Sequence, residues 1–398
     1  MNVLITYGWC RTAYSVAMSL AKAGHRVSVC SSSPVSMTRF SRFAHSFDRT
    51  PDPFGDETAY VSRLAEIVER RQIGLIMPVH EDALAIQRHR GLIPAGVKIA
   101  APCREALELA LDKGRLLGAA EKLGVPVPKT FAPPTIEAAE SLLRECSYPV
   151  VIKPRHGNSG KGVTIACNDE EARNAYRELA AMLQSGSGEP PIVQSHVAGV
   201  LAGSAFLADS GRVVACFTEK YTRCKRAGFG TSVLREPYLD EGVREATELL
   251  VKGLGWHGVG HLDFIVAADG TPFLIEMNPR FWGALQMSTL NGYNFPLALL
   301  EQTVWGEVKS DCFTPRPDSV PCLWIAGELI ACVEELRCMH WSAPVRSVFR
   351  ILSSELLGRY DDFRWDDPVP FLAELCYYGA GYVRSGGDTN PVSPGMLR

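Results

Sequence analysis

Two carboxylates and an amide in the second half of the chain have the spacing of a metal site. Residues 258–283 read GVGHLDFIVAADGTPFLIEMNPRFWG, in which two runs of alternating apolar and polar residues are joined by the turn sequence ADG. Asp263 lies on the first run, and Glu276 and Asn278, two residues apart, point to one face of the second. Such a hairpin can bring all three together. Carboxylate and amide oxygens suit Mg²⁺, with Mn²⁺ as an alternative ion, so we predict a metal site here.

The same hairpin indicates what the metal would hold. Arg280 lies two residues beyond Asn278, so its guanidinium would meet an anion bound at the metal. A solvated acidic face is the alternative, but the run FLIEMN places both polar side chains in a strongly apolar context. The hairpin therefore predicts a metal–nucleotide site.

A glycine-rich loop is the second chemical signal. Residues 148–166 read YPVVIKPRHGNSGKGVTIA, where Lys153 ends an apolar strand and Lys161 lies in the loop that follows. Glycine lacks a Cβ atom, so the backbone N–H groups of this loop can approach an anion closely. A strand follows at once, which distinguishes it from the G-x-x-x-x-G-K-[ST] loop that opens a helix. By itself it is either an anion-binding loop or a mobile hairpin; the acidic hairpin and Lys113 on a preceding helix favour anion binding.

The N-terminal region must position part of the ligand. Its strands and helices alternate, which predicts a Rossmann-like α/β domain with a parallel sheet. The first loop reads YGWCRTA and lacks the G-x-G-x-x-G of dinucleotide sites, so a nicotinamide or flavin role is disfavoured. Arg11, Glu81 and Asp82 are expected at the rim where ligands gather, with solvated loops as the alternative.

Composition limits the class of protein. The 398-residue chain can hold more than one domain, and its net charge of −3 gives no bulk attraction to nucleic acid or to an anionic membrane. Its 12 cysteines are scattered without C-x-x-C pairs, as in a reducing compartment. The N-terminus lacks the basic start of a signal peptide, and no apolar run is long enough to span a membrane. We therefore expect a cytoplasmic protein that binds neither nucleic acid nor membrane.

The motifs, taken in order, resemble those of the ATP-grasp superfamily. The run IKP followed by HGNSGKGV is similar to its phosphate-binding lid, PIVQSHVAG to its adenine-binding hinge, and HLDFIVAADGTPFLIEMNPRFWG to its magnesium motif. The likeness covers residues 110–305, and the LIEMNPR element is its most specific part. The pattern is nearest to the carboxylate–amine ligases and the carbamoyl-phosphate-synthetase-like group.

The resemblance implies a mixed α/β and α+β multidomain fold. Residues 1–112 would form the Rossmann-like domain that precedes a two-lobed ATP-grasp fold. Residues 113–193 would be its small lid subdomain, and residues 194–305 its metal- and nucleotide-binding subdomain. Residues 306–398 would be a C-terminal extension of unassigned role with a disordered tail.

The resemblance also implies a role for each matching residue. The residues around the phosphates of ATP would be Lys113, Lys153, Ser159, Gly160, Lys161 and Gly162, and those lining the adenine Gln194, Ser195, His196 and Val197. The hairpin residues Asp263, Glu276 and Asn278 would hold the metal. Catalytic roles would fall to Arg280, which would stabilise the transferred phosphoryl group, to Lys153 and to His261.

Two positions depart from the family pattern. The hinge usually reads Gln-Glu, whereas this chain has Gln194 followed by Ser195, which removes one side-chain contact to adenine. The D-alanine–D-alanine ligases place arginine two residues before the metal aspartate, where this chain has His261, so that branch is disfavoured. His261 would either hydrogen-bond an intermediate or serve as a structural histidine.

The second substrate is expected near residues 217–237. In relatives a comparable loop covers the acceptor, so Arg223 and Arg235 are candidate carboxylate clamps, with a solvated basic hairpin as the alternative. Trp282 would border the acceptor pocket.

These expectations predict an ATP-dependent carboxylate–amine ligase that forms an amide through an acyl phosphate and releases ADP and phosphate. Its partners would be small-molecule carboxylates and amines, with a homodimer left open. The alternatives are a carbamoyl-phosphate-synthetase-like or other phosphoryl-transfer enzyme acting on a small acid, and a non-catalytic ATP-binding module.

Overall fold

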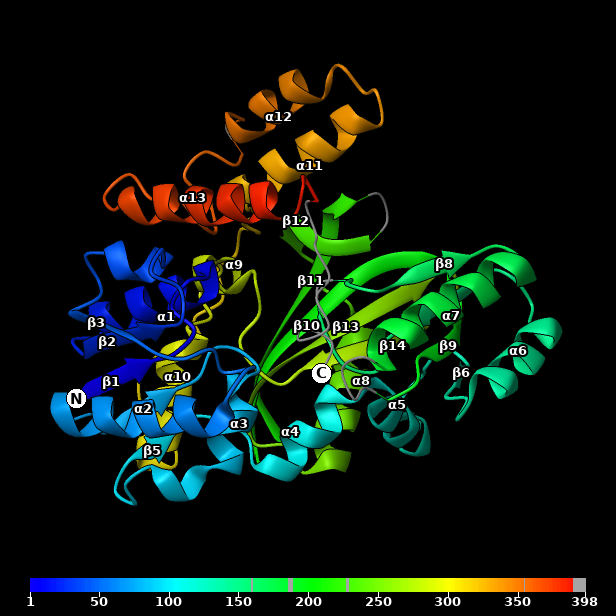
Figure 1. Ribbon diagram of the computed structural model, residues 1–398. Helices are drawn as coiled ribbons and strands as arrows, with labels where there is room; N and C mark the ends of the chain where they lie inside the picture. Colours follow the sequence, from blue (N-terminus) through cyan, green and yellow to red (C-terminus); the bar gives the residue numbers. More distant parts are fainter. Residues whose placement is uncertain (159, 185–188, 227–228, 354, 389–398) are drawn as a thin grey trace.

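The protein combines three β-sheets with helices that cover them (Figure 1). The computed structural model describes residues 1–158, 160–184, 189–226, 229–353 and 355–388. A parallel sheet near the N-terminus and antiparallel sheets further along confirm the predicted mixed α/β and α+β class. In the described part of the chain, no helix is long and apolar enough to cross a membrane.

The N-terminal domain is built on a five-stranded parallel sheet in the order β3-β2-β1-β4-β5. Its strands are β1 (Asn2–Ile5), β2 (Arg26–Ser31), β3 (Ser46–Arg49), β4 (Leu75–Met77) and β5 (Lys98–Ile99). Its helices are α1 (Arg11–Lys22), α2 (Glu57–Arg71), α3 (Asp82–Arg88) and the 3-10 turns η1 (Met37–Phe40) and η2 (Arg90–Leu92). Val3, Leu4 and Ile5 are fully buried, as expected when helices cover both faces of a parallel sheet. The predicted Rossmann-like arrangement is confirmed.

Two helices lead from this domain into the small lobe. They are α4 (Arg104–Leu111) and α5 (Lys113–Lys122), so Lys113 lies on a helix as expected. Asp112 separates them because its carboxylate accepts from the N–H groups of Gly114 at 2.9 Å and Arg115 at 3.1 Å, which caps α5. Lys113 therefore begins a new helix.

The small lobe is a four-stranded sheet in the order β6-β9-β7-β8, packed against two helices. Its elements are β6 (Thr130–Phe131), α6 (Ile136–Glu145), β7 (Val150–Lys153), β8 (Thr164–Ala166), α7 (Asp169–Gln184) and β9 (Ile192–Ser195). Every residue of β9 pairs with β7, so the expected boundary between 193 and 194 falls inside a strand. A division after Ser195 keeps this sheet whole.

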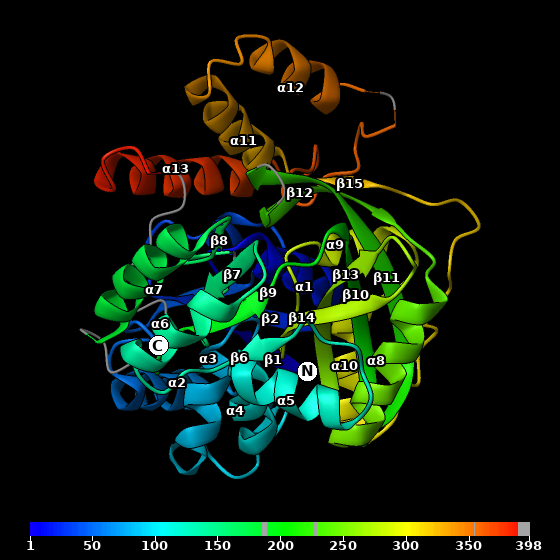
Figure 2. The same ribbon diagram turned by 90° about the vertical axis from the view of Figure 1, so that its right-hand side faces the viewer.

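The large lobe is a six-stranded antiparallel sheet in the order β14-β13-β10-β11-β12-β15 (Figure 2). Its strands are β10 (Gly199–Asp209), β11 (Arg212–Arg226), β12 (Phe229–Pro237), β13 (Gly258–Ala267), β14 (Pro272–Asn278) and β15 (Cys322–Leu323), and its helices are α8 (Glu241–Leu254), α9 (Leu285–Leu290) and α10 (Phe295–Trp305). One buried cluster joins this sheet through α9 and α10 to β1 and α1, while another joins it to α5 and α8. The large lobe and the N-terminal domain thus share one continuous core.

The C-terminal extension folds back over the molecule. It consists of α11 (Ile325–Arg337), α12 (Ala343–Ile351) and α13 (Val369–Arg384), and α13 lies across the N-terminal domain in Figure 1. Asp362 accepts from the first N–H groups of α11, and Asp367 accepts from the hydroxyls of Ser41 at 2.7 Å and Tyr14 at 3.3 Å. Asp362 thus caps α11 within the extension, and Asp367 fixes the extension to the domain that begins the chain.

Candidate functional site

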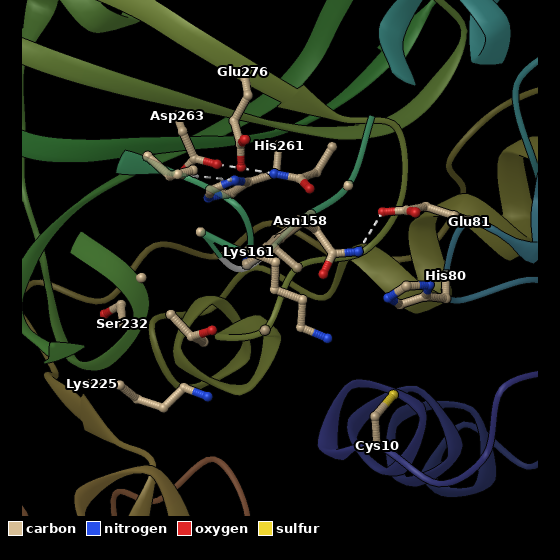
Figure 3. A pocket seen from close by; sticks show the side chains of 18 of the residues that line it. Cys10, His80, Glu81, Asn158, Lys161, Lys225, Ser232, His261, Asp263 and Glu276 are labelled. Carbon is tan, nitrogen blue, oxygen red and sulfur yellow. Dashed lines mark hydrogen bonds and ion pairs between the residues drawn. The ribbon is translucent and has the colours of Figure 1, made fainter. Parts of the chain in front are cut away.

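A cavity of about 1200 Å³ lies where the N-terminal domain, both lobes and α13 meet (Figure 3). Parallel strands of the N-terminal sheet end at its rim, and β13 and β14 form its floor. Most of the residues selected from the sequence lie along its wall. Their geometry is described from the floor upward.

The hairpin brings the acidic residues together. Asp263 pairs with Glu276, and His261 with Asn278, across β13 and β14. The Asn278 amide donates from Nδ2 to Asp263 Oδ2 at 3.0 Å, and its Oδ1 accepts from Arg280 Nη2 at 3.1 Å. All of these side chains line the cavity. The arrangement is a hard-oxygen cluster with a guanidinium at its edge.

Two buried lysines lie beside this cluster. Lys113 Nζ is 3.6 Å from Glu276 Oε2 and donates to the Gly157 carbonyl at 2.5 Å. Lys153 Nζ donates to the Ile275 carbonyl at 3.2 Å. Burial, reinforced by the charge of Lys113, lowers the pKa of Lys153 to about 8. An anion held here would face two cations with little water around them.

The two floor carboxylates titrate differently. Burial raises the pKa of Asp263 to about 6, with Glu276 adding to the effect. Burial also acts to raise the pKa of Glu276, but the charges of Lys113 and Lys153 outweigh it and hold this pKa below its usual value. Glu276 is therefore the more readily ionised of the pair.

These residues could hold a hard cation. Within the described part of the chain, no group of at least three His, Cys, Asp or Glu side chains forms a metal-binding cluster. A cation on Asp263 and Glu276 would thus need the Asn278 amide oxygen, then phosphate and water for its other positions, as Mg²⁺ prefers. The amide now presents its nitrogen to Asp263, so half a rotation of the amide would put the oxygen there.

The glycine-rich loop between β7 and β8 forms one side of the cavity. Gly157, Gly160 and Lys161 are lining residues, and Gly160 and Gly162 both have φ of 68°, which favours glycine. Asn158 Nδ2 donates to Glu81 Oε1 at 2.8 Å, so the loop contacts the N-terminal domain (Figure 3). A Cβ at Gly162 would lie 3.3 Å from Leu179, on the packed side of the loop.

Ser159, also selected from the sequence, lies outside the described residues.

The hinge strand β9 supplies the next part of the wall. Gln194, His196 and Val197 line the cavity, whereas Ser195 is not among its described lining residues. Gln194 Nε2 donates to Thr130 Oγ1 at 2.8 Å. The His196 N–H donates to the Pro149 carbonyl at 3.3 Å, so a ligand at the hinge would meet other backbone groups.

His261 lies deep in the acidic floor and is almost fully buried. It is 2% exposed, with Nε2 3.3 Å from Glu219 Oε1 and Nδ1 3.8 Å from Asp263 Oδ1. Gly203 makes room for it, because a Cβ there would lie 2.7 Å from His261 Nε2. The ring of Trp282 is stacked 5.7 Å away. The imidazole thus lies beside Asp263 without a hydrogen bond to it, and the Tyr221 hydroxyl donates to Asp263 Oδ1.

The basic segment 217–237 is part of a long hairpin of β11 and β12, and its selected arginines have partners within the chain. Arg235 lines the cavity but forms an ion pair with buried Glu219. Arg223 lies 2.8 Å from Glu328 and 2.6 Å from Glu335, which ties β11 to α11. A carboxylate bound by either arginine would have to compete with these pairs.

The three rim candidates have different surroundings. Arg11 and Glu81 line the cavity, and Arg280 Nη2 is 3.6 Å from Glu81 Oε1. Asp82 is fully buried and accepts from the Tyr60 hydroxyl at 2.7 Å, which places it behind the wall.

Sequence reasoning missed the aromatic part of the wall. Tyr7 and Trp9 line the cavity from the first loop, and Tyr377 and Tyr378 line it from α13. The YGW sequence directly after the first strand was an available signal for the loop. Nothing in the local sequence of α13 indicates that it returns to this site.

The floor, lysines and glycine loop define a class of domain. Residues 110–284 match the ATP-grasp domain family, so this part of the chain is an ATP-grasp domain. The carbamoyl phosphate synthase large chain of Pyrococcus furiosus is 25% identical over 263 residues, a match that covers 64% of this chain and 24% of that relative. The chain therefore corresponds to about a quarter of this curated relative.

Solved structures share the fold. A biotin carboxylase–β,γ-ATP complex from Campylobacter jejuni has a TM-score of 0.68 at 18% identity, covering 80% of this chain and 74% of its own. An L-amino acid ligase from Bacillus licheniformis has a TM-score of 0.65 at 19% identity, covering 80% of this chain and 78% of its own. At these identities the likeness establishes the fold.

Proposed function

We propose that the protein is an ATP-dependent carboxylate–amine ligase that uses Mg²⁺. One observation carries the proposal: Asp263, Glu276 and Asn278 lie in one cavity with Lys113 and Lys153, within a matched ATP-grasp domain. Adenine binding alone needs neither the acidic floor nor a guanidinium beside it. A site of this charge pattern suits a metal-bound triphosphate from which a phosphoryl group is transferred.

Each group of cavity-lining residues has a role in this proposal. The metal, held by Asp263, Glu276 and Asn278, would neutralise charge on the phosphates. Lys113 and Lys153 bind phosphate oxygens, and Gln194 with the hinge backbone borders the adenine. Gly160 and Lys161 cover the phosphates from the loop. The protein acts through position and electrostatics, so no side-chain nucleophile is needed.

The reaction proceeds in two balanced steps. An oxygen of the substrate carboxylate forms a bond to the γ-phosphorus while the bond to ADP breaks, giving an acyl phosphate. An amine then forms a bond to the acyl carbon, phosphate leaves, and the amine loses a proton. Arg280 stabilises the transferred phosphoryl group, and His261 acts as a positioning residue through Asp263.

Two relatives support this class from different sides. The solved structure with the ligase name shares the fold over most of its length, and the carbamoyl phosphate synthase match covers 64% of this chain. The carbamoyl phosphate synthase match also fits the alternative, in which the protein phosphorylates a small acid and forms no amide. The partners in either case are small molecules, and a homodimer is compatible with both.

The test is ADP and phosphate release with MgATP against a panel of amino acids and other small acids, with and without amines. The ligase proposal expects release that depends on an acid, together with an amide product detected by mass spectrometry. Acid-dependent ADP release without an amide supports phosphoryl transfer only. ATP binding without release across the panel supports the non-catalytic module.

A further inference from the structure

Aromatic rings from the two ends of the chain meet in the cavity. Trp9 stacks on Tyr377 of α13, with ring centroids 4.3 Å apart and an interplanar angle of 18°. Tyr378 contacts the same indole edge-on at 6.3 Å, and Tyr7 lies 5.5 Å from it. All four side chains also line the cavity, so they do more than pack α13 against the N-terminal domain.

The cluster continues along the end of the parallel sheet. Tyr7 stacks on His80 at 4.1 Å and meets Phe54 edge-on at 6.0 Å. We use the name aromatic wall for the cavity-lining set of Tyr7, Trp9, Phe54, His80, Trp324, Tyr377 and Tyr378. These rings present apolar faces and edges, which suit a planar group of a ligand better than a charged one.

The wall is neutral, unlike the floor. Burial, together with the charge of Arg280, lowers the pKa of His80 to about 3, so this imidazole carries no charge at neutral pH. Burial raises the pKa of Tyr7 well above its usual value. Cations border the rings: Arg11 and Lys225 lie over the Trp324 ring, at 3.8 Å and 5.4 Å, and the charges of Arg280 and Lys161 act on His80. The cavity therefore has an acidic floor with buried lysines and a wall of uncharged rings bordered by charged side chains.

Tyr7 has a backbone conformation that needs an explanation. Its φ is 55°, in the left-handed region that few residues other than glycine adopt. The Gly8 N–H donates to the Cys30 carbonyl at 2.9 Å and holds the loop close to β2. Strained conformations of this kind concentrate at binding and active sites. Here the strain places an aromatic ring in the cavity.

Open space accompanies the rings. Gly381 lines the cavity one helical turn after Tyr377 and Tyr378, and no described atom lies within 4 Å of a Cβ built on it. A cavity of about 1200 Å³ also exceeds the roughly 300–1,000 Å³ of most single-ligand pockets. A second group can therefore lie beside a nucleotide, against the wall.

We propose that the aromatic wall binds a planar apolar group, an aryl side chain, of the small-molecule substrate. This inference rests on the ligase function proposed above and names the substrate class for the same cavity. The aryl group lies against Trp9, Tyr377 and Tyr378, and its polar end points past Arg280 to the metal floor. An aryl amino acid combines these two chemistries in one molecule.

Matched pairs of probes test the proposal by binding. L-phenylalanine and L-alanine differ by one phenyl ring, and calorimetry with the MgADP-saturated protein compares their Kd values. We expect L-phenylalanine to bind at least about tenfold more tightly, as burial of a phenyl ring requires. The pairs 3-phenylpropionate with propionate and benzylamine with methylamine then show whether the aryl group belongs to the acid or to the amine.

Two glycines of α13 provide a variant and its control. Gly381→Phe fills the open space and should abolish the tenfold preference, whereas Gly379→Phe should keep it. Neither site has a described atom within 4 Å of a built Cβ, but only Gly381 is among the described lining residues. Both changes replace glycine inside a helix, so both variants should fold, which circular dichroism verifies.

The outcomes separate this inference from the proposed function. Equal binding of the paired probes, or an equal loss of preference in both variants, would overturn it. ADP release with alanine but not with phenylalanine would also overturn it, while leaving the ligase function standing. A tenfold aryl preference without ADP release on any acid would support the wall and contradict the ligase.

Discussion

The two halves of the cavity are built from different kinds of sequence. The floor comes from one hairpin, in which Asp263, Glu276 and Asn278 are close in sequence, and it is charged. The aromatic wall joins Trp9 to Tyr377, which come from opposite ends of the chain, and it is neutral. Under the proposed function, the floor would bind the metal and the phosphates, and the wall would select the substrate.

The largest effect should come from the floor. Glu276→Gln keeps the side-chain shape but removes the carboxylate that lies 3.6 Å from Lys113. We expect acid-dependent ADP release to fall by about 10²–10³-fold, the cost of losing one preorganised charge at a reacting centre. Glu241→Gln on the exposed start of α8 is the matched control. Unchanged turnover in Glu276→Gln would contradict the assignment of Glu276 as a metal ligand.

A smaller loss is expected from a cation beside the floor. Lys153→Met retains most of the buried side-chain volume but removes the ammonium group, so MgADP should bind about 10–100-fold more weakly. Calorimetry measures the Kd, with Lys129→Met at an exposed position as the control. An unchanged Kd would show that phosphate lies elsewhere.

The wall should respond in stability rather than in nucleotide binding. Trp9→Ala removes the stack on Tyr377, and we expect the free energy of unfolding to fall by about 2 kcal/mol. Denaturant unfolding measures it, and Trp365→Ala, at a side chain that is 75% exposed, should change little. A weaker MgADP affinity in Trp9→Ala, equal to that of Lys153→Met, would contradict the division into two halves.

The smallest effect concerns how α13 is held. Burial raises the pKa of Glu374 well above its usual value, with Asp362 adding to the effect, and Glu374 accepts from Trp324 Nε1 at 3.2 Å. When the pKa of a carboxyl is higher in the folded than in the unfolded protein, the free energy of unfolding falls as pH rises above the unfolded pKa. Glu374→Gln should therefore raise the Tm at pH 8 and change it much less at pH 4, because glutamine resembles the protonated carboxyl. An equal shift at both values would assign the effect to packing.

The floor was predictable because its signals are local. Alternation in FLIEMN sets Glu276 and Asn278 on one face, and the ADG turn brings β14 beside β13. Glu276 comes directly opposite Asp263 because the register shifts between Asp263 and Phe264, an irregularity that the spacing does not reveal. The parallel N-terminal sheet followed from the alternation of strands and helices along the first part of the chain.

Long-range partners were not predictable from local patterns. The arginines at 223 and 235 read as open clamps. The partner of Arg223, Glu328, is set by the packing of α11 against β11, whereas Arg235 pairs with Glu219 on the neighbouring strand of its own hairpin. The wall depends on α13 folding back onto Trp9, and its local sequence records only an apolar helix. Contacts of this separation are decided by tertiary packing, which one sequence does not display.

The transfer of one oxygen atom tests the central claim most directly. The acid from the panel that gives the fastest ADP release is labelled with ¹⁸O in its carboxylate, and the released phosphate is analysed by mass spectrometry. If the carboxylate attacks the γ-phosphorus of ATP above the Asp263–Glu276 floor and an amide then forms, the phosphate carries one ¹⁸O atom. Phosphate without the label would show that no acyl phosphate forms and would contradict the ligase mechanism.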